Sequence, residues 1–471
     1  MLYLMLVLYW ATVGTTSPLQ RRAPTTANTA TVNLANKTGS PEHLAAGFIY
    51  GIPDVLHQIP SHFYTEMGFN YGRAGGAQLP APARGWIWGM SDYQGRFQSA
   101  YSNFLTTREY GGNFILLPHD LWGTDQSNSS TVWPGDDGNW TNYDQFVDTV
   151  LEDLKAYNML EHVVWDTWNE PDGGYFWQRS EAQYLELWDR TVKRIRGDDT
   201  LAALQITGPS YAGSPSPSNP WWTGWLNEVK TNDTIPDYYS WHLEGGPDDP
   251  TQNIAENLPL LNSMLAEYGL PDRQININEY ATFEEQVASA SAWWIASLER
   301  QNILGLRGNW EEPGYALHDF MSNLLYKPWV DDSYTNWTKT GYWPNGDYQV
   351  YKYYASKMTG TRVGTDSSED AKFDVYATID GSNVKLLAGT RLVEGTYYIQ
   401  VENLSSIGLP DSGILDVETW ALIDDGHYAQ VDGPVHKPTK SIVYSNDTVV
   451  IPVDQTAKAG NSAWAFEFQG A

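Results

Sequence analysis

The sequence predicts a (β/α)8 TIM barrel followed by an accessory antiparallel β-sandwich domain. Between about residues 44 and 330, short strand-like runs alternate eight times with longer amphipathic segments, which is the pattern of such a barrel. After about residue 360 the strands follow one another directly and are separated by Gly, Pro, Asn and Asp, as in a sandwich. We therefore expect the barrel over residues 40–345 and the sandwich over residues 346–471, with strand 28–38 joining the sandwich.

Eight short apolar runs are the expected barrel strands. In sequence order they are Ala45–Gly51, Phe69–Gly75, Asn113–His119, His162–Trp168, Leu204–Pro209, Tyr238–His242, Gln274–Glu279 and Gly305–Trp310. In a barrel of this kind the chemistry lies at the C-terminal ends of the strands. Polar residues that end these runs are therefore the candidates for a functional site.

The segments between these runs have the spacing of amphipathic helices. Asp144–Met159 places Phe146, Val147 and Val150 on one face, since residues three or four apart share one side of a helix. Further helices are expected over Glu181–Arg196, Asn253–Tyr268 and Glu284–Arg300, with His318–Tyr326 as the last one.

The expected strands of the sandwich lie close together in the C-terminal part of the chain. They are Phe373–Ile379, Asn383–Leu387, Tyr397–Val401, Val417–Ile423, Ser441–Tyr444, Thr448–Val453 and Ala463–Phe468. Ala30–Ala35, which precedes the barrel, is expected to be a further strand of the same sandwich. The chain contains no cysteine, so its stability must come from burial in a large core and not from disulfides.

The N-terminus is typical of a secreted protein. The apolar run Met1–Ala11 is too short to span a bilayer and lacks stop-transfer charges, so residues 1–22 are expected to be a signal peptide with a possible short pro-segment. Arg21-Arg22 is either a dibasic processing site or an exposed arginine pair. Glycosylation is indicated by seven Asn-x-Ser/Thr sequons, at Asn36, Asn128, Asn139, Asn232, Asn336, Asn403 and Asn446.

The composition excludes several classes of partner. A formal net charge of −29 repels nucleic acid, anionic membranes and strongly acidic polysaccharides. The chain also has 22 tryptophans and 30 tyrosines, whose faces pack against the C–H faces of sugar rings, although such residues serve ordinary cores as well. The charge suits a solvated extracellular protein but says little about the reaction.

Two glutamates end two of the expected strands. Glu170 lies in Trp165–Asp172 after the fourth strand, and Glu279 lies in Ile275–Tyr280 at the end of the seventh. Cleaving a glycosidic bond with retention needs a proton donor and an attacking carboxylate about 5–5.5 Å apart. Glu170 is the candidate acid/base and Glu279 the candidate nucleophile; the alternative is a pair of surface glutamates that follow strands by chance.

These two motifs resemble those of a known group of enzymes. Trp168-Asn169-Glu170-Pro171 and Asn278-Glu279-Tyr280 are similar to the motifs of the retaining clan A (β/α)8 glycoside hydrolases. Within that clan the chain looks most like glycoside hydrolase family 39, which includes β-xylosidases and α-L-iduronidases. The resemblance implies that Glu170 is the acid/base, that Glu279 is the nucleophile and that Asn169 contacts the sugar 2-hydroxyl.

Other polar residues at the same strand ends are candidates for binding substrate. Arg73 ends the second strand and is expected to hydrogen-bond Glu279 and keep it charged, or else to form an internal salt bridge. His119 and Asp120 end the third strand and are expected to bind sugar hydroxyls, with helix capping as the alternative for Asp120. Tyr280 is a second candidate for a hydrogen bond to Glu279.

Two further candidates follow from the resemblance. Related enzymes place a histidine near the nucleophile, which implies a site role for His242 at the end of the sixth strand; the alternative is a core histidine. An aromatic floor beneath the reacting sugar is expected after the eighth strand, which implies Trp310, with plain core packing as the alternative.

The sequence as a whole predicts a secreted, retaining O-glycosidase that needs no cofactor and no metal. Its expected substrates are neutral cell-wall oligo- or polysaccharides, attacked from the chain end. Two alternatives stay open. One is a transglycosylase on the same scaffold, in which a sugar replaces water as the acceptor. The other is a non-catalytic carbohydrate-binding barrel, which would be expected to have lost one of the two glutamates.

Overall fold

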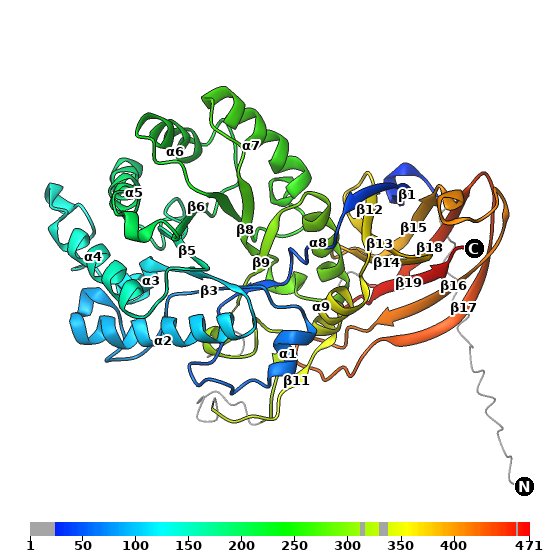
Figure 1. Ribbon diagram of the computed structural model, residues 1–471, viewed down its shortest axis with the longest axis horizontal. Helices are drawn as coiled ribbons and strands as arrows, with labels where there is room; N and C mark the ends of the chain where they lie inside the picture. Colours follow the sequence, from blue (N-terminus) through cyan, green and yellow to red (C-terminus); the bar gives the residue numbers. More distant parts are fainter. Residues whose placement is uncertain (1–23, 311–315, 329–337, 458–459) are drawn as a thin grey trace, which may run out of the picture.

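The protein consists of a closed eight-stranded barrel beside a nine-stranded β-sheet (Figure 1). The computed structural model describes residues 24–310, 316–328, 338–457 and 460–471. Eight parallel strands with interleaved helices form the barrel, and the sheet is mostly antiparallel. The predicted fold class is therefore confirmed.

The barrel strands follow one another around the barrel in sequence order. They are β2 (Gly47–Ile49), β3 (Tyr71–Ala74), β4 (Asn113–Leu116), β5 (Val163–Asp166), β6 (Gln205–Tyr211), β7 (Tyr238–Leu243), β8 (Gln274–Tyr280) and β9 (Leu304–Arg307). Pairing of β9 with β2 closes the ring. All eight coincide with predicted strands, because parallel strands covered on both faces have continuous apolar sequences.

Helices alternate with the strands, and most of them cover the outside of the barrel. They are α1 (Ser61–Glu66), α2 (Met90–Glu109), α3 (Pro118–Trp122), α4 (Thr141–Ala156), α5 (Glu181–Arg196), α6 (Pro220–Thr231), α7 (Ile254–Tyr268), α8 (Ala288–Arg300) and α9 (Gly346–Lys357). The short α3 instead lies at the mouth of the barrel, directly after β4. Side-chain caps fix several helix starts, including Ser180 before α5, Asn219 before α6 and Asn253 before α7.

One predicted helix is wrong. His318–Tyr326 contains a short 3-10 turn (Ala316–His318) and the two-residue strand β10 (Leu325–Tyr326), which pairs with β11 (Trp343–Pro344). Four consecutive residues, Phe320 to Asn323, have positive φ angles between 50° and 66°, so the backbone there turns in the left-handed sense. The helix that follows β9 is α9, which lies within the range expected for the sandwich.

The second sheet contains the N-terminal strand and the C-terminal strands. They are β1 (Thr29–Gly39), β12 (Thr361–Asp366), β13 (Phe373–Asp380), β14 (Asn383–Thr390), β15 (Gly395–Glu402), β16 (Gly413–Leu422), β17 (Val435–Tyr444), β18 (Thr448–Gln455) and β19 (Ala463–Gln469). The order across the sheet is β17-β16-β19-β14-β13-β12-β1-β15-β18. β1 pairs antiparallel with β12 and parallel with β15, so the strand expected near residues 28–38 lies inside this sheet.

The sheet has a hydrophobic core of its own. Side chains from both ends of the strand order meet in it, including Val32 of β1, Leu415 of β16 and Ile451 of β18. The sheet therefore folds over, and its two halves pack face to face as in a sandwich.

Helix α8 joins the barrel to the sheet, as Figure 1 shows. It packs against β13, β14 and β19. Arg391 of the sheet domain is buried at this junction, where it pairs with Glu285 and lies 4.7 Å from the ring centres of Trp293 and Trp294. The two parts are thus linked by a buried charge as well as by apolar packing.

Six of the seven sequons lie in the described residues. Asn36, Asn128, Asn139 and Asn446 are exposed, while Asn232 and Asn403 are half-buried. Asn336 and the expected signal peptide, residues 1–22, lie outside the described residues. Within the described ranges, no helix combines the length and the apolar character needed to cross a membrane.

Candidate active site

The turn that follows β5 holds Glu170 over the mouth of the barrel. Glu170 has a positive φ of 43°, which a residue with a side chain seldom adopts. The backbone N–H of Glu170 donates to the carbonyl of Ser210 at 2.9 Å. The Asp172 carboxylate accepts from the N–H groups of Ala212 and Gly213, both at 2.9 Å. The β6 loop therefore fixes the unusual backbone that carries Glu170.

A cavity of about 250 Å³ opens at this end of the barrel. It brings together five of the residues singled out in the sequence, namely Asn169, Glu170, Glu279, His119 and Asp120. The other described residues that line it are Ile49, Tyr50, Ala77, Gln78, Leu117, Asp125, Tyr175, Phe176, Glu244, Asn309 and Leu317. The lining thus contains five carboxyl groups, and no lysine or arginine among the described residues.

His242 lies between the two candidate catalytic glutamates. Its Nδ1 is 2.8 Å from Glu170 Oε1, and its Nε2 is 3.7 Å from Glu279 Oε1. Burial alone would lower the pKa of His242, but the charge of Glu279 and the hydrogen bond with Glu170 outweigh it and raise the pKa. Glu170 and Glu279 therefore face the two nitrogens of one imidazole ring, and the site role expected for His242 agrees with its position.

Glu170 and His242 form a hydrogen-bonded acid–base pair. Burial alone would raise the pKa of Glu170, but the hydrogen bond with His242 and the charges of His242 and Arg73 outweigh it and lower the pKa. In the unliganded protein the proton shared by this pair therefore resides mainly on His242. The 2.8 Å hydrogen bond between them gives the proton a direct path from one group to the other.

Because the pKa of His242 is raised in the folded protein, its contribution to stability is expected to depend on pH. A histidine whose pKa is higher in the folded protein stabilises the fold fully below its unfolded pKa of about 6.5, and the effect is lost as the pH rises through the folded value. His242→Gln is therefore expected to lower the Tm more near pH 5 than near pH 8.5. Thermal unfolding at the two pH values measures this, with the exposed His62→Gln as a control that shows no such difference. A larger loss near pH 8.5 would contradict the assignment.

Arg73 links Glu279 to the residues around it. Its fully buried guanidinium donates to Glu279 at 2.5 Å, to Asp166 at 2.9 Å and to Asn169 at 2.7 Å. Asp166 in turn accepts from Asn278 Nδ2 at 2.8 Å. The predicted hydrogen bond between Arg73 and Glu279 is present, and the alternative of an internal salt bridge holds as well, through Asp166.

Arg73→Lys is expected to damage the site although it conserves charge. A lysine ammonium cannot reproduce the planar fork that serves Asp166, Asn169 and Glu279 together. We expect kcat/KM on a cleaved glycoside to fall on the order of 100-fold, since charge-assisted hydrogen bonds are lost. Arg84→Lys, which alters a partly exposed pair with Asp92, is the matched control and should leave the rate near that of the unaltered protein.

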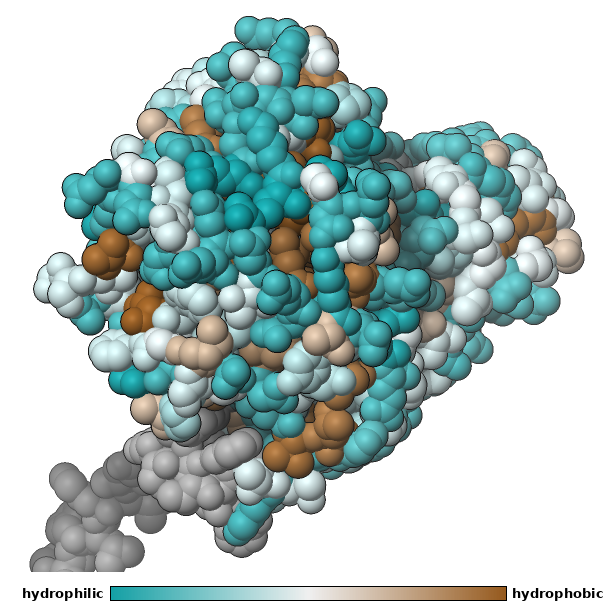
Figure 2. Space-filling model, turned by 60° about the vertical axis from the view of Figure 1, so that its left-hand side comes forward, coloured by the Kyte–Doolittle hydropathy of each residue, from teal (hydrophilic) through white to brown (hydrophobic). Residues whose placement is uncertain are grey.

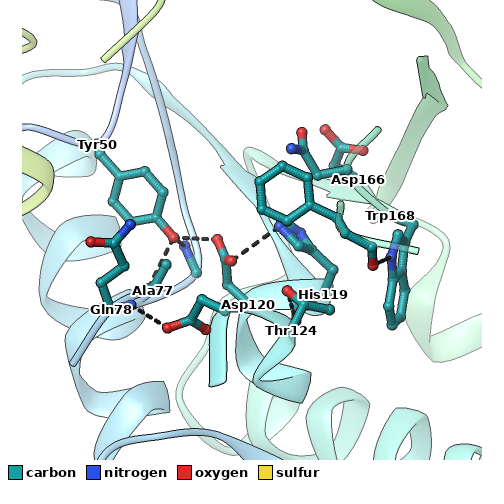
Figure 3. A network of polar contacts seen from close by, with 12 residues as sticks. Tyr50, Ala77, Gln78, His119, Asp120, Thr124, Asp166 and Trp168 are labelled. Atoms are coloured by element: carbon teal, nitrogen blue, oxygen red, sulfur yellow. Dashed lines mark hydrogen bonds and ion pairs between the residues drawn. The ribbon is translucent and has the colours of Figure 1, made fainter. Parts of the chain in front are cut away.

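His119 and Asp120 lie on α3 at the end of β4, against Tyr50 (Figure 3). Asp120 accepts from the Tyr50 hydroxyl and lies 3.0 Å from His119 Nε2. The Tyr50 hydroxyl also accepts the N–H groups of Gly75 and Ala77, each at 3.0 Å. This network makes one rigid polar wall of the cavity, at the place where the sequence predicted hydroxyl-binding residues.

Four predicted residues are not part of the described cavity lining: Arg73 and His242, which contact its glutamates, and Tyr280 and Trp310. Tyr280 is fully buried. Its hydroxyl donates to the carbonyl of Ala45 at 3.1 Å and lies 2.7 Å from the hydroxyl of Tyr351. The Tyr280 side chain therefore packs between the barrel and α9. It points away because successive side chains of a strand face opposite sides and Glu279 faces inward. Trp310 is half-buried, lies outside the described cavity lining, and donates its indole N–H to Ala281 at 3.0 Å.

The sequence did not single out Glu244 or Tyr50 as site residues. Glu244 follows β7 two residues after His242, so its place at a strand end was the available signal. Oxygens of Glu170 and Glu244 and a ring nitrogen of His242 lie within 4.8 Å of one another. Two of the three groups, Glu170 and His242, are joined by a hydrogen bond.

Comparison with known proteins places the fold among glycoside hydrolases. No family model matches the chain, and no curated protein is similar to it in sequence. Among solved structures, N2152 from Neocallimastix frontalis aligns with a TM-score of 0.70 at 20% identity, over 94% of this chain and 100% of that one. A family 39 glycoside hydrolase from Xanthomonas axonopodis pv. citri aligns with a TM-score of 0.57 at 14% identity, over 96% and 98%.

Other neighbours widen the range of families. A monomeric β-xylosidase from Caulobacter crescentus aligns with a TM-score of 0.57 at 14% identity, over 94% of this chain and 100% of that one. Further neighbours belong to glycoside hydrolase families 30 and 44. The chain thus shares its fold with solved glycoside hydrolases of several families.

Proposed function

We propose that the protein is a retaining O-glycosidase in which Glu279 is the nucleophile and Glu170 the acid/base. The observation that carries this is the placement of both carboxyl groups against one imidazole, in a single cavity at the C-terminal mouth of the barrel. Mouths of such barrels hold the active site in the enzymes that have this fold. The order of the two glutamates along the chain also matches the clan that the sequence resembles.

Each carboxyl group has an environment suited to its proposed step. The Arg73 guanidinium lies 2.5 Å from Glu279 and so places a positive charge beside the carboxylate that attacks the anomeric carbon. Glu170 must carry a proton when the leaving oxygen departs. A bound sugar displaces water from the site, and loss of water favours the neutral pair, in which His242 has passed its proton to Glu170. Glu170, then ionised, takes a proton from the water that releases the glycosyl intermediate.

The cavity supports a neutral sugar bound at the end of a glycan. Its five carboxyl groups disfavour a negatively charged uronate at the same place. A volume of about 250 Å³ is below the range of about 300–1,000 Å³ usual for small-molecule sites, so it suits one sugar better than a chain. Tyr175, which is 69% exposed, lies on the loop after Glu170 and offers an aromatic face to the leaving group.

The substrate range and the family are part of the proposal. Solved neighbours that include a β-xylosidase and family 30 xylanases favour neutral plant cell-wall glycans and, within the clan, family 39 is the assignment that the motifs support. We further propose that the protein is secreted and N-glycosylated. Loss of mass on treatment of the secreted protein with a glycosidase specific for N-glycans tests that part alone.

A panel of aryl glycosides and cell-wall oligosaccharides, with products followed by proton NMR, tests the proposed function. We expect hydrolysis of at least one neutral glycoside, with release of the terminal sugar and the anomeric configuration of the substrate retained in the first product. Inversion would exclude the nucleophilic role of Glu279. Transfer to a sugar in place of water would indicate a transglycosylase, and absence of any turnover would favour a binding protein.

A further inference from the structure

A third carboxyl group faces the two proposed catalytic ones. Glu244 directly follows β7 and lines the same cavity as Glu170 and Glu279. The residue is half-buried, and its carboxyl group lies within hydrogen-bonding reach of that of Glu279. The double-displacement reaction uses two carboxyl groups, which in the proposed function are Glu170 and Glu279, so Glu244 is neither the acid/base nor the nucleophile.

Two carboxyl groups can share a hydrogen bond only if one of them carries a proton, because an ionised carboxylate has no donor. Glu279 is the better candidate for the ionised partner, since the Arg73 guanidinium lies 2.5 Å from it. No lysine, arginine or histidine in the described part of the chain lies within ion-pair distance of Glu244. The proton in this bond therefore belongs to Glu244.

We propose that Glu244 is a positioning residue for Glu279, which it holds through a hydrogen bond donated by its own protonated carboxyl group. The role rests on the proposed function, because Glu279 is the nucleophile there. By donating to one oxygen while Arg73 donates as well, Glu244 would fix the direction of the attacking carboxylate and favour its charged form.

The surroundings of Glu244 support a neutral acid. Burial raises its pKa, and the nearby charges of Glu279 and Glu170 raise it further, while Arg73 only partly offsets them. Glu279 faces Glu244 from β8, Glu170 from the loop after β5, and Arg73 from β3. His242 lies on β7, two residues before Glu244. From the β9 side the described neighbour is the backbone at Gly308, which carries no charge.

The position of Glu244 is also restricted by its neighbours. A Cβ placed on Gly308 would lie 2.4 Å from a carboxyl oxygen of Glu244. The Gly308 N–H donates to the carbonyl of Tyr280 at 2.9 Å, which ties this backbone to the strand that carries Glu279. Glycine at position 308 thus lets the backbone close over the Glu244 carboxyl group.

Three variants test the proposal through the pH profile of kcat/KM on the best aryl glycoside of the panel. Glu244→Ala removes the donor, so kcat/KM is expected to fall about 10- to 100-fold, and the acidic limb, where the nucleophile takes up a proton, is expected to move to higher pH. Glu244→Gln keeps a neutral donor of the same size and should restore part of the rate with the acidic limb in place. Exposed Glu284→Ala is the matched control.

Opposite shifts would overturn the proposal. If Glu244 were ionised, both Glu244→Ala and Glu244→Gln would remove a negative charge and move the acidic limb to lower pH. A loss of rate in Glu244→Ala without movement of the limb would mean that Glu244 acts on folding alone. Gly308→Ala, which displaces the Glu244 carboxyl group without removing it, is expected to move the limb in the same direction as Glu244→Ala.

A spectroscopic readout separates this proposal from the proposed function. The infrared difference spectrum between the unaltered protein and Glu244→Gln at pH 7 is expected to show the band of a protonated carboxylic acid. Carboxylate bands in its place would overturn the protonation of Glu244, whatever the enzyme hydrolyses. If the acid band is present and no glycoside is cleaved, the proposed function fails, and the positioning role fails with it.

Discussion

Glu279→Gln is expected to reduce kcat/KM on the order of 10⁴- to 10⁶-fold, because an amide cannot attack the anomeric carbon. The substitution conserves size, so the hydrogen bond from Arg73 remains possible and the fold is expected to survive. Hydrolysis of the best aryl glycoside of the panel measures the loss. Glu279→Ala with added azide is expected to recover turnover, since azide fits the space left by the carboxylate and attacks the sugar directly.

A control variant and the configuration of the azide product test this prediction further. Glu267→Gln on α7, an exposed glutamate shortly before β8, is the matched control and should hydrolyse at the rate of the unaltered protein. The azide product of Glu279→Ala should have the anomeric configuration opposite to that of the substrate, because a single displacement inverts it. A Glu279→Gln protein that kept the unaltered rate would remove Glu279 from the mechanism.

Glu170→Ala is expected to reduce kcat/KM about 10²- to 10⁴-fold for substrates whose leaving group must be protonated. For aryl glycosides with a strongly acidic phenol the first step needs no proton, so release of the intermediate should limit the rate instead. Comparison of a nitrophenyl glycoside with an oligosaccharide of the same sugar measures the difference. Azide should here give a product of retained configuration, since it replaces the water of the second step.

The control for Glu170 lies on the same strand. Glu161 is exposed at the opposite, N-terminal end of β5, and Glu161→Ala should leave both substrates unaffected. An equal loss of rate on good and poor leaving groups would contradict a general-acid role for Glu170. It would favour a role in binding or in holding His242.

Much of the fold could be predicted from the sequence, because the barrel strands are buried on both faces and stand out as short apolar runs. The error over His318–Tyr326 has a physical cause. Its apolar residues have helical spacing, but the backbone runs left-handed from Phe320 to Asn323, where packing and hydrogen bonds such as Arg307 Nε to the Ser322 carbonyl at 2.8 Å outweigh the local preference.

Site residues that lie within a recognisable motif could be predicted from the sequence, whereas most of those outside the motifs could not. Glu170 and Glu279 end their strands within recognisable motifs. Arg73 was expected near Glu279 because both residues end strands at the same mouth of the barrel. Tyr280 was misplaced because a strand-end motif does not show which side chain faces inward. Glu244 follows a strand whose register with β8 shifts between Trp241 and His242, so sequence spacing could not show that its carboxyl group reaches Glu279.

Glu279 is expected to form a covalent glycosyl intermediate during the reaction. A 2-deoxy-2-fluoro analogue of the preferred glycoside, carrying a good leaving group, slows both steps and traps such an intermediate. Peptide mass spectrometry of the inactivated enzyme is expected to find the added sugar on the peptide that contains Glu279, and at that residue. A label on Glu170 or Glu244, or hydrolysis with inversion and no label at all, would contradict the account.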